Sequence, residues 1–295
     1  MESSRCKAFL AAADLGSFTK AAESLSYTPS GVSQLVSALE KELGFALFTR
    51  YKKGVVLTDA GKEILPAIRS FLQQEERIFQ TAADIRGLSI GQITIASYPS
   101  MSARWLPRVI REFQEDYPNI QIRLLEGIRQ EITEWLDDSS ADIGFMSWME
   151  DLSFDFIPLA KDKMIAVLPK DHPLANADVY PLARCREEDF IMPANGRDDD
   201  VALLLERNNI EPHITYTTME NPAAISMIEN GLGMSVMNER STLNWSSDVA
   251  KLPLDPPGDI ILGMAIPSLE RSSPAVRKFT EYAKRILMHE EYTPV

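Results

Sequence analysis

The sequence predicts a multidomain chain with a small N-terminal unit of short helices, one long helix and a larger α/β unit. Three patterns predict this order. Apolar residues recur at helical spacing over residues 5–48, and a heptad-like stripe follows over residues 59–86. From residue 92 onward, short apolar strands alternate with amphipathic helices. At 295 residues the chain is long enough to bury more than one core.

The N-terminal unit opens with a predicted helix over residues 5–14, followed by two short helices joined by a tight turn. Ser17 suits the cap of the second helix. The third begins at Thr28-Pro29, where the threonine hydroxyl can cap and proline fits the first helical position. Its apolar stripe consists of Val32, Leu35, Val36 and Leu39. This pattern predicts a helix-turn-helix, whose last helix enters the DNA major groove. An ordinary pair of packed helices is the alternative.

The opposite face of the third helix is polar, uncharged and built from short side chains. Such a face can lie close to the base edges of duplex DNA. We expect DNA contacts from this helix at Thr28, Pro29, Ser30, Ser33, Gln34 and Ser37. Gly31 has no evident reason to stand there, because glycine inside a helix costs about 1 kcal/mol relative to alanine.

A basic turn between two short extended segments follows, which predicts a β-wing over residues 49–57. Arg50, Lys52 and Lys53 would offer positive charge to DNA phosphates without reading sequence. A solvated basic loop is the alternative. Residues 1–60 carry a net charge of +1 and the rest −14, within a total of −13. The acidity therefore lies outside the predicted DNA-binding unit, where it discourages non-specific DNA contact.

The long helix predicted over residues 59–86 carries a narrow apolar stripe with steps of four and three. Its dimerisation positions would be Ile64, Ile68, Phe71, Ile78 and Ile85. Glu75 is the polar break in this stripe, and Pro66 should tilt the helix start. The pattern predicts a homodimer, which would place two recognition helices on one face of an interrupted palindrome. A helix packed on its own domain is the alternative.

Residues 86–91 look like a hinge into the α/β unit. The predicted strands are 92–97, 120–125, 142–147, 163–168, 190–192, 214–217, 234–237 and 260–266. The predicted helices are 105–117, 131–136, 200–208, 223–230 and 274–288. Alternation of this kind implies α/β layers with largely parallel sheets.

A ligand site in such a unit lies at the carboxyl ends of the strands. The candidate effector-binding residues are Tyr98, Ser100, Met101, Ser147, Trp148, Asn195, Arg197 and Met237. Arg197 can clamp a carboxylate, and the two aromatic side chains can stack on a flat ligand. We therefore predict a small organic acid. The alternatives are that the serines cap helices, the methionines fill the core, and Arg197 pairs with the following run Asp198-Asp199-Asp200.

Metal and catalytic chemistry find no support in the sequence. His172, His213 and His289 are scattered, and Cys6 and Cys185 fit no metal or redox spacing. The run Asp198-Asp199-Asp200 is explained more simply by a charged helix start than by a metal site. We predict no cofactor, no metal, no catalytic residue and no enzymatic activity. The sequence shows neither a signal core nor a bilayer-length apolar run, so we expect a cytoplasmic protein without a membrane partner.

The N-terminal segment resembles the winged helix-turn-helix of LysR-type transcriptional regulators. The matching residues are Ser17-Phe18, Ala21-Ala22, Leu25, Val32-Ser33, Leu39-Glu40, Leu43-Gly44, Leu47-Phe48, Arg50 and Leu57-Thr58-Asp59-Ala60-Gly61. More weakly, G-x-I-T-I-A from Gly91 and the segments LPRVIREFQEDYPNIQIRL, ADIGF and HPLA resemble the periplasmic-binding-protein-like effector domain of that family.

The resemblance implies a DNA-binding domain at 1–58, a dimerising linker helix at 59–87 and an effector domain at 88–295. Subdomain I would comprise 91–161 and 268–295, and subdomain II 162–267, with crossings near 161–163 and 267–268. We expect a sequence-specific DNA-binding regulator of transcription that binds an interrupted palindromic promoter site and a small effector.

We expect it to act as a dimer assembled into a tetramer, with RNA polymerase open as a further partner. Two other classes stay open. One is a solute-binding protein of a transport system, which the helix-turn-helix and the missing signal peptide argue against. The other is an α/β enzyme with a DNA-binding appendage, which the lack of a catalytic constellation argues against.

Overall fold

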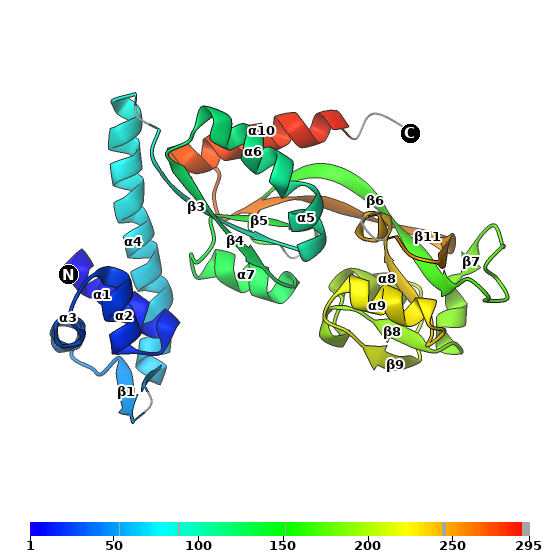
Figure 1. Ribbon diagram of the computed structural model, residues 1–295, viewed down its shortest axis with the longest axis horizontal. Helices are drawn as coiled ribbons and strands as arrows, with labels where there is room; N and C mark the ends of the chain where they lie inside the picture. The colour runs from blue at the N-terminus through cyan, green and yellow to red at the C-terminus, as the bar shows by residue number, and fades with distance from the viewer. Residues whose placement is uncertain (53, 88, 151, 244–245, 291–295) are drawn as a thin grey trace.

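The computed structural model describes residues 1–52, 54–87, 89–150, 152–243 and 246–290. For residues 289 and 290 it describes the backbone only. The predicted order of units is confirmed. In Figure 1 a compact helical unit is followed by one long helix and then by two α/β lobes. Among the helices in these ranges, none has both the length and the apolar composition needed to cross a bilayer.

The N-terminal unit, here called the winged unit, is the predicted helix-turn-helix with a wing. Its elements are α1 (Ser3–Leu15), α2 (Phe18–Leu25), α3 (Pro29–Leu43) and the antiparallel strands β1 (Phe48–Tyr51) and β2 (Gly54–Leu57). The predicted caps are confirmed: the side chain of Ser17 accepts from the N–H of Lys20, and that of Thr28 from the N–H of Gly31. Gly44 ends α3 with φ of 86°, a conformation that favours glycine.

Helix α4 (Asp59–Ile85) is anchored in the winged unit at its first turn. The Thr58 hydroxyl caps it by accepting from the N–H of Gly61 at 2.9 Å. A Cβ on Gly61 would lie only 2.3 Å from the carbonyl oxygen of Leu47, so the helix packs directly on the backbone that enters the wing. The orientation of α4 relative to the winged unit is therefore set by backbone contact.

The first α/β lobe, here called lobe I, surrounds the next strands. Its elements are β3 (Gly91–Ser97), α5 (Pro99–Arg104), α6 (Leu106–Asp116), β4 (Ile120–Glu126), α7 (Arg129–Asp137), β5 (Ile143–Ser147) and α10 (Pro274–Glu290). Helices α6 and α10 cover one face of the sheet and α7 covers the other (Figure 1). Phe113 and Phe279 meet edge to face at 5.2 Å in the larger of the two cores.

The second lobe, here called lobe II, has its own core. Its helices are η1 (Leu182–Arg186), η2 (Ala194–Gly196), α8 (Asp199–Arg207), α9 (Asn221–Glu229) and η3 (Glu239–Thr242). Its strands are β7 (Tyr180–Pro181), β8 (Phe190–Met192), β9 (Ile214–Thr217) and β10 (Ser235–Asn238). Tyr180, Phe190 and Val236 are fully buried among these elements.

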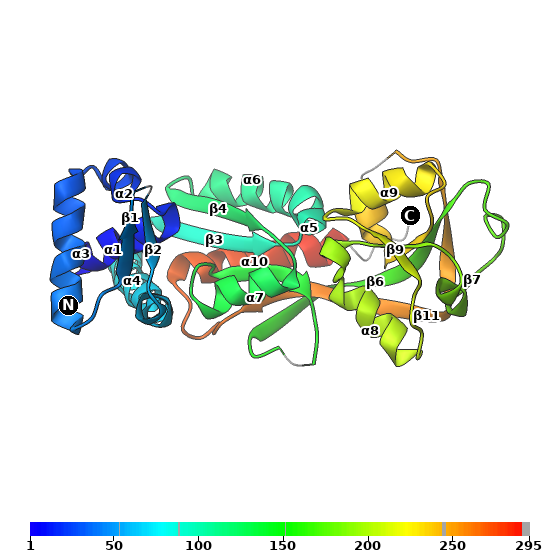
Figure 2. The same cartoon turned by 90° about the horizontal axis from the view of Figure 1, so that it is seen from below.

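Two long strands, β6 (Asp155–Pro169) and β11 (Val249–Ile266), connect the lobes (Figure 2). They pair antiparallel in a sheet of order β10-β6-β11-β5-β3-β4. The prediction of largely parallel sheets is wrong here, because along this order only β3 pairs in parallel, with β4 and β5. The reason is topological: one strand leads into lobe II and the other returns, so the two must run in opposite directions.

Candidate functional site

The polar face of α3 is open to solvent, as predicted. Val32, Val36 and Leu39 are fully buried on its other side. Ser30, Gln34 and Ser37 are exposed, and Ser33 is half-buried. Short polar side chains on a helix anchored from behind can approach base edges without displacing bulky groups. The arrangement fits insertion of α3 into a groove of duplex DNA.

Arg50 lies in β1 of the wing, but its side chain is hydrogen-bonded to α3. Its guanidinium donates to the hydroxyls of Ser33, at 3.2 Å, and Ser37, at 3.4 Å. It also lies 5.0 Å from the ring centroid of Phe18. Arg50 is therefore hydrogen-bonded to two of the predicted base-reading serines, of which Ser37 stays exposed. Lys52 is exposed at the wing turn, whereas Lys53 lies outside the described residues.

Glu40 holds the end of α3 to the start of the wing. One of its carboxylate oxygens accepts from the backbone N–H groups of Leu47 at 2.8 Å and Phe48 at 3.3 Å. Near the other end of α3, a Cβ on Gly31 would press on the Thr28 cap oxygen at 3.1 Å. Glycine at this position leaves the N-cap undisturbed, which supplies the physical reason that the sequence lacked.

The predicted dimerisation stripe on α4 divides into two halves. Ile68 is 1% exposed in the core of the winged unit, and Ile64 and Phe71 pack against that core. Ile78 and Ile85 are 68% and 83% exposed. Glu75, expected as a polar break between two helices, forms an ion pair with Lys7 of α1 at 2.9 Å. The second half of the stripe is more open to a partner than the first half, which packs against the chain's own winged unit.

A cavity of about 260 Å³ lies between lobe I and lobe II. Of the predicted effector-binding residues, Tyr98, Ser100 and Arg197 line it. Met101 and Met237 are buried in the cores of lobe I and lobe II. The remaining three lie elsewhere: Trp148 and Asn195 are exposed outside the lining, and Ser147 is buried beside it.

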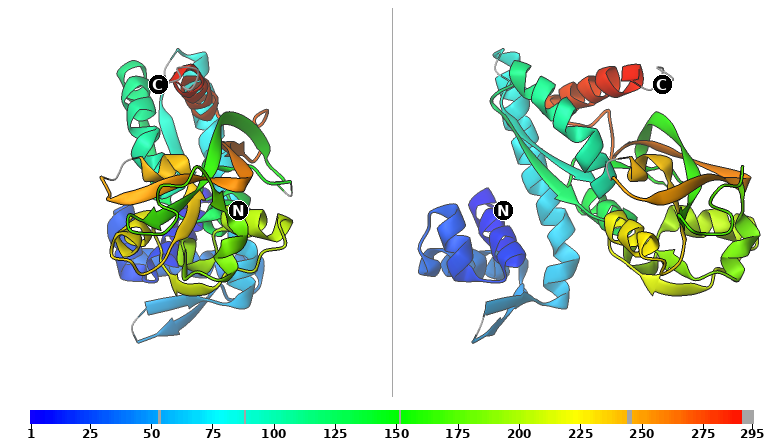
Figure 3. Two further views of the ribbon diagram at one scale, coloured as in Figure 1. Left: turned by 90° about the vertical axis from the view of Figure 1, so that its right-hand side faces the viewer. Right: turned by 45° about the vertical axis from the view of Figure 1, so that its right-hand side comes forward.

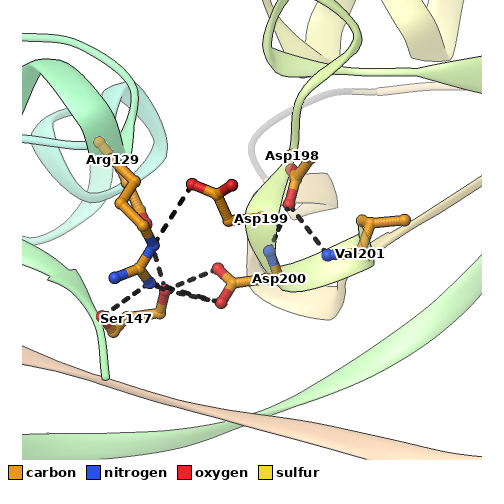
Figure 4. A network of polar contacts seen from close by, with 7 residues as sticks. Arg129, Ser147, Asp198, Asp199, Asp200 and Val201 are labelled. Atoms are coloured by element: carbon orange, nitrogen blue, oxygen red, sulfur yellow. Dashed lines mark hydrogen bonds and ion pairs between the residues drawn. The ribbon is translucent and has the colours of Figure 1, made fainter. Parts of the chain in front are cut away.

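Arg129, the first residue of α7, ties the lobes together across the cavity (Figure 4). It donates to the carbonyl of Ser147 at 2.9 Å and to the Ser147 hydroxyl. Its guanidinium forms ion pairs with Asp199 at 3.7 Å and Asp200 at 3.6 Å, both from lobe II. The Ser147 hydroxyl donates to Asp200 at 2.6 Å and lies 3.2 Å from the hydroxyl of Tyr98. We call this set the cleft network, and it consists of Tyr98, Arg129, Ser147, Asp199 and Asp200.

The cleft network sits in surroundings that penalise charge. Burial and, to a lesser extent, the nearby charge of Asp200 raise the pKa of Asp198 to about 6, against hydrogen bonds from two backbone N–H groups. Burial also raises the pKa of Asp200, although Arg129 opposes the shift. Burial raises the pKa of Tyr98 as well. An ion that enters this cavity must therefore be matched by a specific partner.

The charged groups that line the cavity are mostly acidic. Its carboxylates are Glu126, Glu131, Asp198, Asp199, Asp200 and Glu220. Its two guanidinium groups are Arg129, which is already paired, and Arg197, which is exposed and forms no side-chain hydrogen bond or ion pair with the described residues. The predicted alternative of Arg197 pairing with the aspartates is thus not observed. Among the described residues, no group of three His, Cys, Asp or Glu side chains is arranged to hold a metal.

Arg129 was missed by the sequence prediction, although the rule that found the other residues also applies to it. It follows the carboxyl end of strand β4 by three residues. The predicted site drew on the carboxyl ends of other strands and left out the end of this one. The pairing of Arg129 with Asp199 and Asp200 joins residues about 70 positions apart, which periodicity does not reveal.

Comparisons with known proteins agree with this architecture. Residues 86–287 match the LysR substrate binding domain, and residues 4–62 match the bacterial regulatory helix-turn-helix protein of the lysR family. The chain is 35% identical over 289 residues to the uncharacterized HTH-type transcriptional regulator YvbU of Bacillus subtilis (strain 168), covering 97% of this chain and 99% of that protein.

Two solved structures share the fold. Full-length CbnR, complexed with its target DNA, superposes with a TM-score of 0.66 at 23% identity, covering 97% of this chain and 99% of that chain. The effector binding domain of QuiR, in complex with shikimate, gives a TM-score of 0.61 at 24% identity, covering 68% of this chain and 99% of that chain.

Proposed function

The chain belongs to the LysR family of transcriptional regulators, and we propose that it binds an interrupted palindromic DNA site as a dimer under the control of a small organic acid. It is a DNA-binding regulator with an effector-binding domain, not an enzyme. The proposed domains are 1–58 for DNA binding, 59–87 for the linker helix and 88–295 for the effector domain. Because it acts on chromosomal DNA, we place it in the cytoplasm.

The exposed face of α3 supports the proposed reading of DNA sequence. Ser30, Gln34 and Ser37 supply hydrogen-bonding groups for base edges, and Lys52 offers charge to a phosphate. Arg50 enters the groove together with α3, because it is bonded to that helix rather than to the wing tip. Gln34→Ala should therefore change which bases are preferred rather than weaken all DNA sites alike.

The open half of the α4 stripe supports the proposed dimer. Ile78, Phe79 and Ile85 are each more than 60% exposed, and burying such side chains yields roughly 1.5–3 kcal/mol apiece. The α4 helix of a second copy is the proposed cover, and two dimers would form the tetramer. At a promoter, RNA polymerase would be the further partner. Ile78→Asp should shift the molecular mass in sedimentation equilibrium towards the monomer, and an unchanged mass would refute this interface.

The guanidinium of Arg197 lies on the cavity lining without a partner among the described residues, and it carries the proposal of an organic acid. The surrounding carboxylates restrict which acid fits. A multiply charged anion would be repelled, whereas a monocarboxylate meets the one guanidinium that is open to it, and an amine on the same molecule would meet the acids. QuiR, which shares the fold, has been solved with shikimate in complex with its effector binding domain.

Isothermal titration with three panels of ligands tests the effector class. The panels are monocarboxylates, amino acids and dicarboxylates. We expect binding from the first or second panel and a loss of at least about tenfold in affinity for Arg197→Gln. Binding confined to dicarboxylates, or affinity that is unchanged in the variant, would refute the proposed recognition.

Selection of DNA duplexes from a random library tests the DNA-binding part of the proposal. Duplexes selected from a random library against the full chain should share two half-sites of opposite orientation, separated by a spacer. Selection of a single unrepeated half-site would contradict the proposed dimer on DNA.

A further inference from the structure

Helix α7 has one end in the effector cavity and the other end against the DNA-binding half of the molecule. Arg129 opens the helix, and Asp138 directly follows its last residue. Nine residues span about 13 Å at 1.5 Å per residue. The helix thus bridges the distance between the cleft network and the linker helix.

At the far end, Asp138 forms an ion pair with Arg69 of α4. The same guanidinium binds Asp14, near the end of α1, at 2.7 Å. One side chain therefore joins the winged unit, the linker helix and lobe I. The right-hand view of Figure 3 shows α4 standing between the winged unit and the strands of lobe I. Arg69 is only 16% exposed, so water screens these pairs less than it screens surface pairs.

A second contact lies one helical turn further along α4. Gln73 donates to one oxygen of Asp142 at 2.8 Å, and the other oxygen accepts from the N–H of Thr94 in β3 at 2.7 Å. Asp142 stands just before β5, in the connection that follows α7. The linker helix is therefore held at two successive turns by residues that follow the carboxyl end of α7.

The body of α7 is packed too tightly to absorb a displacement. Ile132 and Leu136 are buried against Gly144 of β5. A Cβ on that glycine would lie 3.0 Å from Ile132 and 2.9 Å from Leu136. No side chain of β5 projects between helix and strand at this point. A helix seated in this way shifts as a rigid body over the strand rather than bending between its ends.

We infer that α7 carries the state of the effector cavity to the DNA-binding unit, with Arg129 as its receiving end and Asp138–Arg69–Asp14 as its output. The inference rests on the proposed effector site. A ligand held by Arg197 changes the charge beside the ion pairs of Arg129 with Asp199 and Asp200, which alters the hold of lobe II on α7.

The displaced helix then moves Asp138 relative to Arg69. If the guanidinium leaves, the carboxylates of Asp14 and Asp138 face each other without a counterion, which disfavours the docked winged unit. Coupling of this kind needs an element with two arrangements that both sites bias, and the ion-paired contacts at each end of α7 supply it.

A double-mutant cycle on DNA affinity tests the inference without an identified effector. The probe is a duplex selected from a random library against the wild-type chain. Arg129→Gln breaks the receiving end, and Asp138→Asn breaks the output end. Asp137→Asn is the matched control, because Asp137 is the exposed neighbour with no side-chain bond to the described residues.

Arg129→Gln should change the DNA dissociation constant by about fivefold or more in the wild-type and Asp137→Asn backgrounds. In the Asp138→Asn background the change should fall below about twofold, because the output is already broken. Asp14→Asn provides a second output variant, with the same expected loss of coupling, should Asp138→Asn fail to fold. Circular dichroism and melting curves establish which variants are folded.

Equal effects of Arg129→Gln in all backgrounds, or no effect in the wild type, would overturn the role of α7. These outcomes differ from failure of the proposed function. If no duplex is enriched by the wild-type chain, specific DNA binding itself is refuted. If a site is enriched but the effects add, the DNA-binding function stands and only the coupling through α7 is lost.

Discussion

Replacing Asp198 by asparagine should stabilise the chain at neutral pH. Asp198 caps α8 by accepting from the backbone N–H groups of Asp200 and Val201, each at 3.1 Å. Asparagine keeps an acceptor oxygen in this position and is an equally good cap. What it removes is a buried negative charge next to Asp200. The substitution therefore tests whether charge in the cleft is as costly as the structure indicates.

The magnitude follows from the pKa. Burial, together with the charge of Asp200, raises the pKa of Asp198 from 3.8 to about 6. The folded state therefore binds the proton more tightly than the unfolded state, so stability is lost as the pH rises from about 4 to about 6. At 1.36 kcal/mol per pKa unit, the cost is at most about 3 kcal/mol at pH 7.5 and about 1 kcal/mol at pH 4.5. Partial exposure of the side chain lowers both values.

Differential scanning calorimetry at pH 4.5 and 7.5 measures the difference. The melting temperature of Asp198→Asn should exceed that of the wild type at pH 7.5 by several degrees, with a smaller gain at pH 4.5. Asp171→Asn, an exposed aspartate of the same half of the chain, is the control and should show no pH-dependent gain. A variant that is less stable than the wild type at both pH values by the same amount would refute the reasoning.

Three further predictions concern the winged unit. Glu40→Ala should destabilise it by about 1–3 kcal/mol in urea, because two backbone N–H groups lose their acceptor, whereas Glu40→Gln should retain most of the stability. Gly61→Ala should cost about 1–3 kcal/mol in the same assay, since the new Cβ would lie 2.3 Å from a backbone carbonyl; an unchanged midpoint would show that α4 can move away. Changing Lys52 and Lys53 to alanine should lower the salt slope of DNA binding by about 1 for each phosphate that is no longer neutralised, and an unchanged slope would rule out that role.

The winged unit could be predicted closely because its signals are local. Thr28-Pro29 starts α3 and Gly44 ends it, so the helix is defined by residues within a few positions of its ends. The linker helix was predicted with equal accuracy, but its pattern did not show that part of its apolar stripe packs on its own winged unit. Ile68 faces the core of its own winged unit, and a heptad pattern does not distinguish that neighbour from a second copy.

The connecting strands were predicted too short. Strand β6 begins at Asp155 rather than near Lys163, and β11 begins at Val249 rather than near Ile260. Prolines and charged residues interrupt both missed segments, and these residues are typical of loops. The register of the β11–β6 pair shifts between Pro253 and Gly258. Strand β11 therefore continues past an irregularity that an alternating sequence pattern does not predict.

Ionic strength should affect this protein in two ways, by weakening the docking of the winged unit through Arg69 and by weakening DNA binding. It holds two carboxylates, Asp14 and Asp138, that would otherwise repel each other, so docking of the winged unit depends on charge as DNA binding does. The two effects should occur at different salt concentrations, because the charged groups behind them differ in burial. Lys52 of the wing is exposed and its attraction to phosphate is screened strongly, whereas Arg69 is largely enclosed and its pairs are screened weakly. Moderate salt should therefore weaken DNA binding before it weakens the contacts of Arg69 with Asp14 and Asp138. The salt dependence of DNA affinity then reports contacts with phosphates rather than undocking of the winged unit.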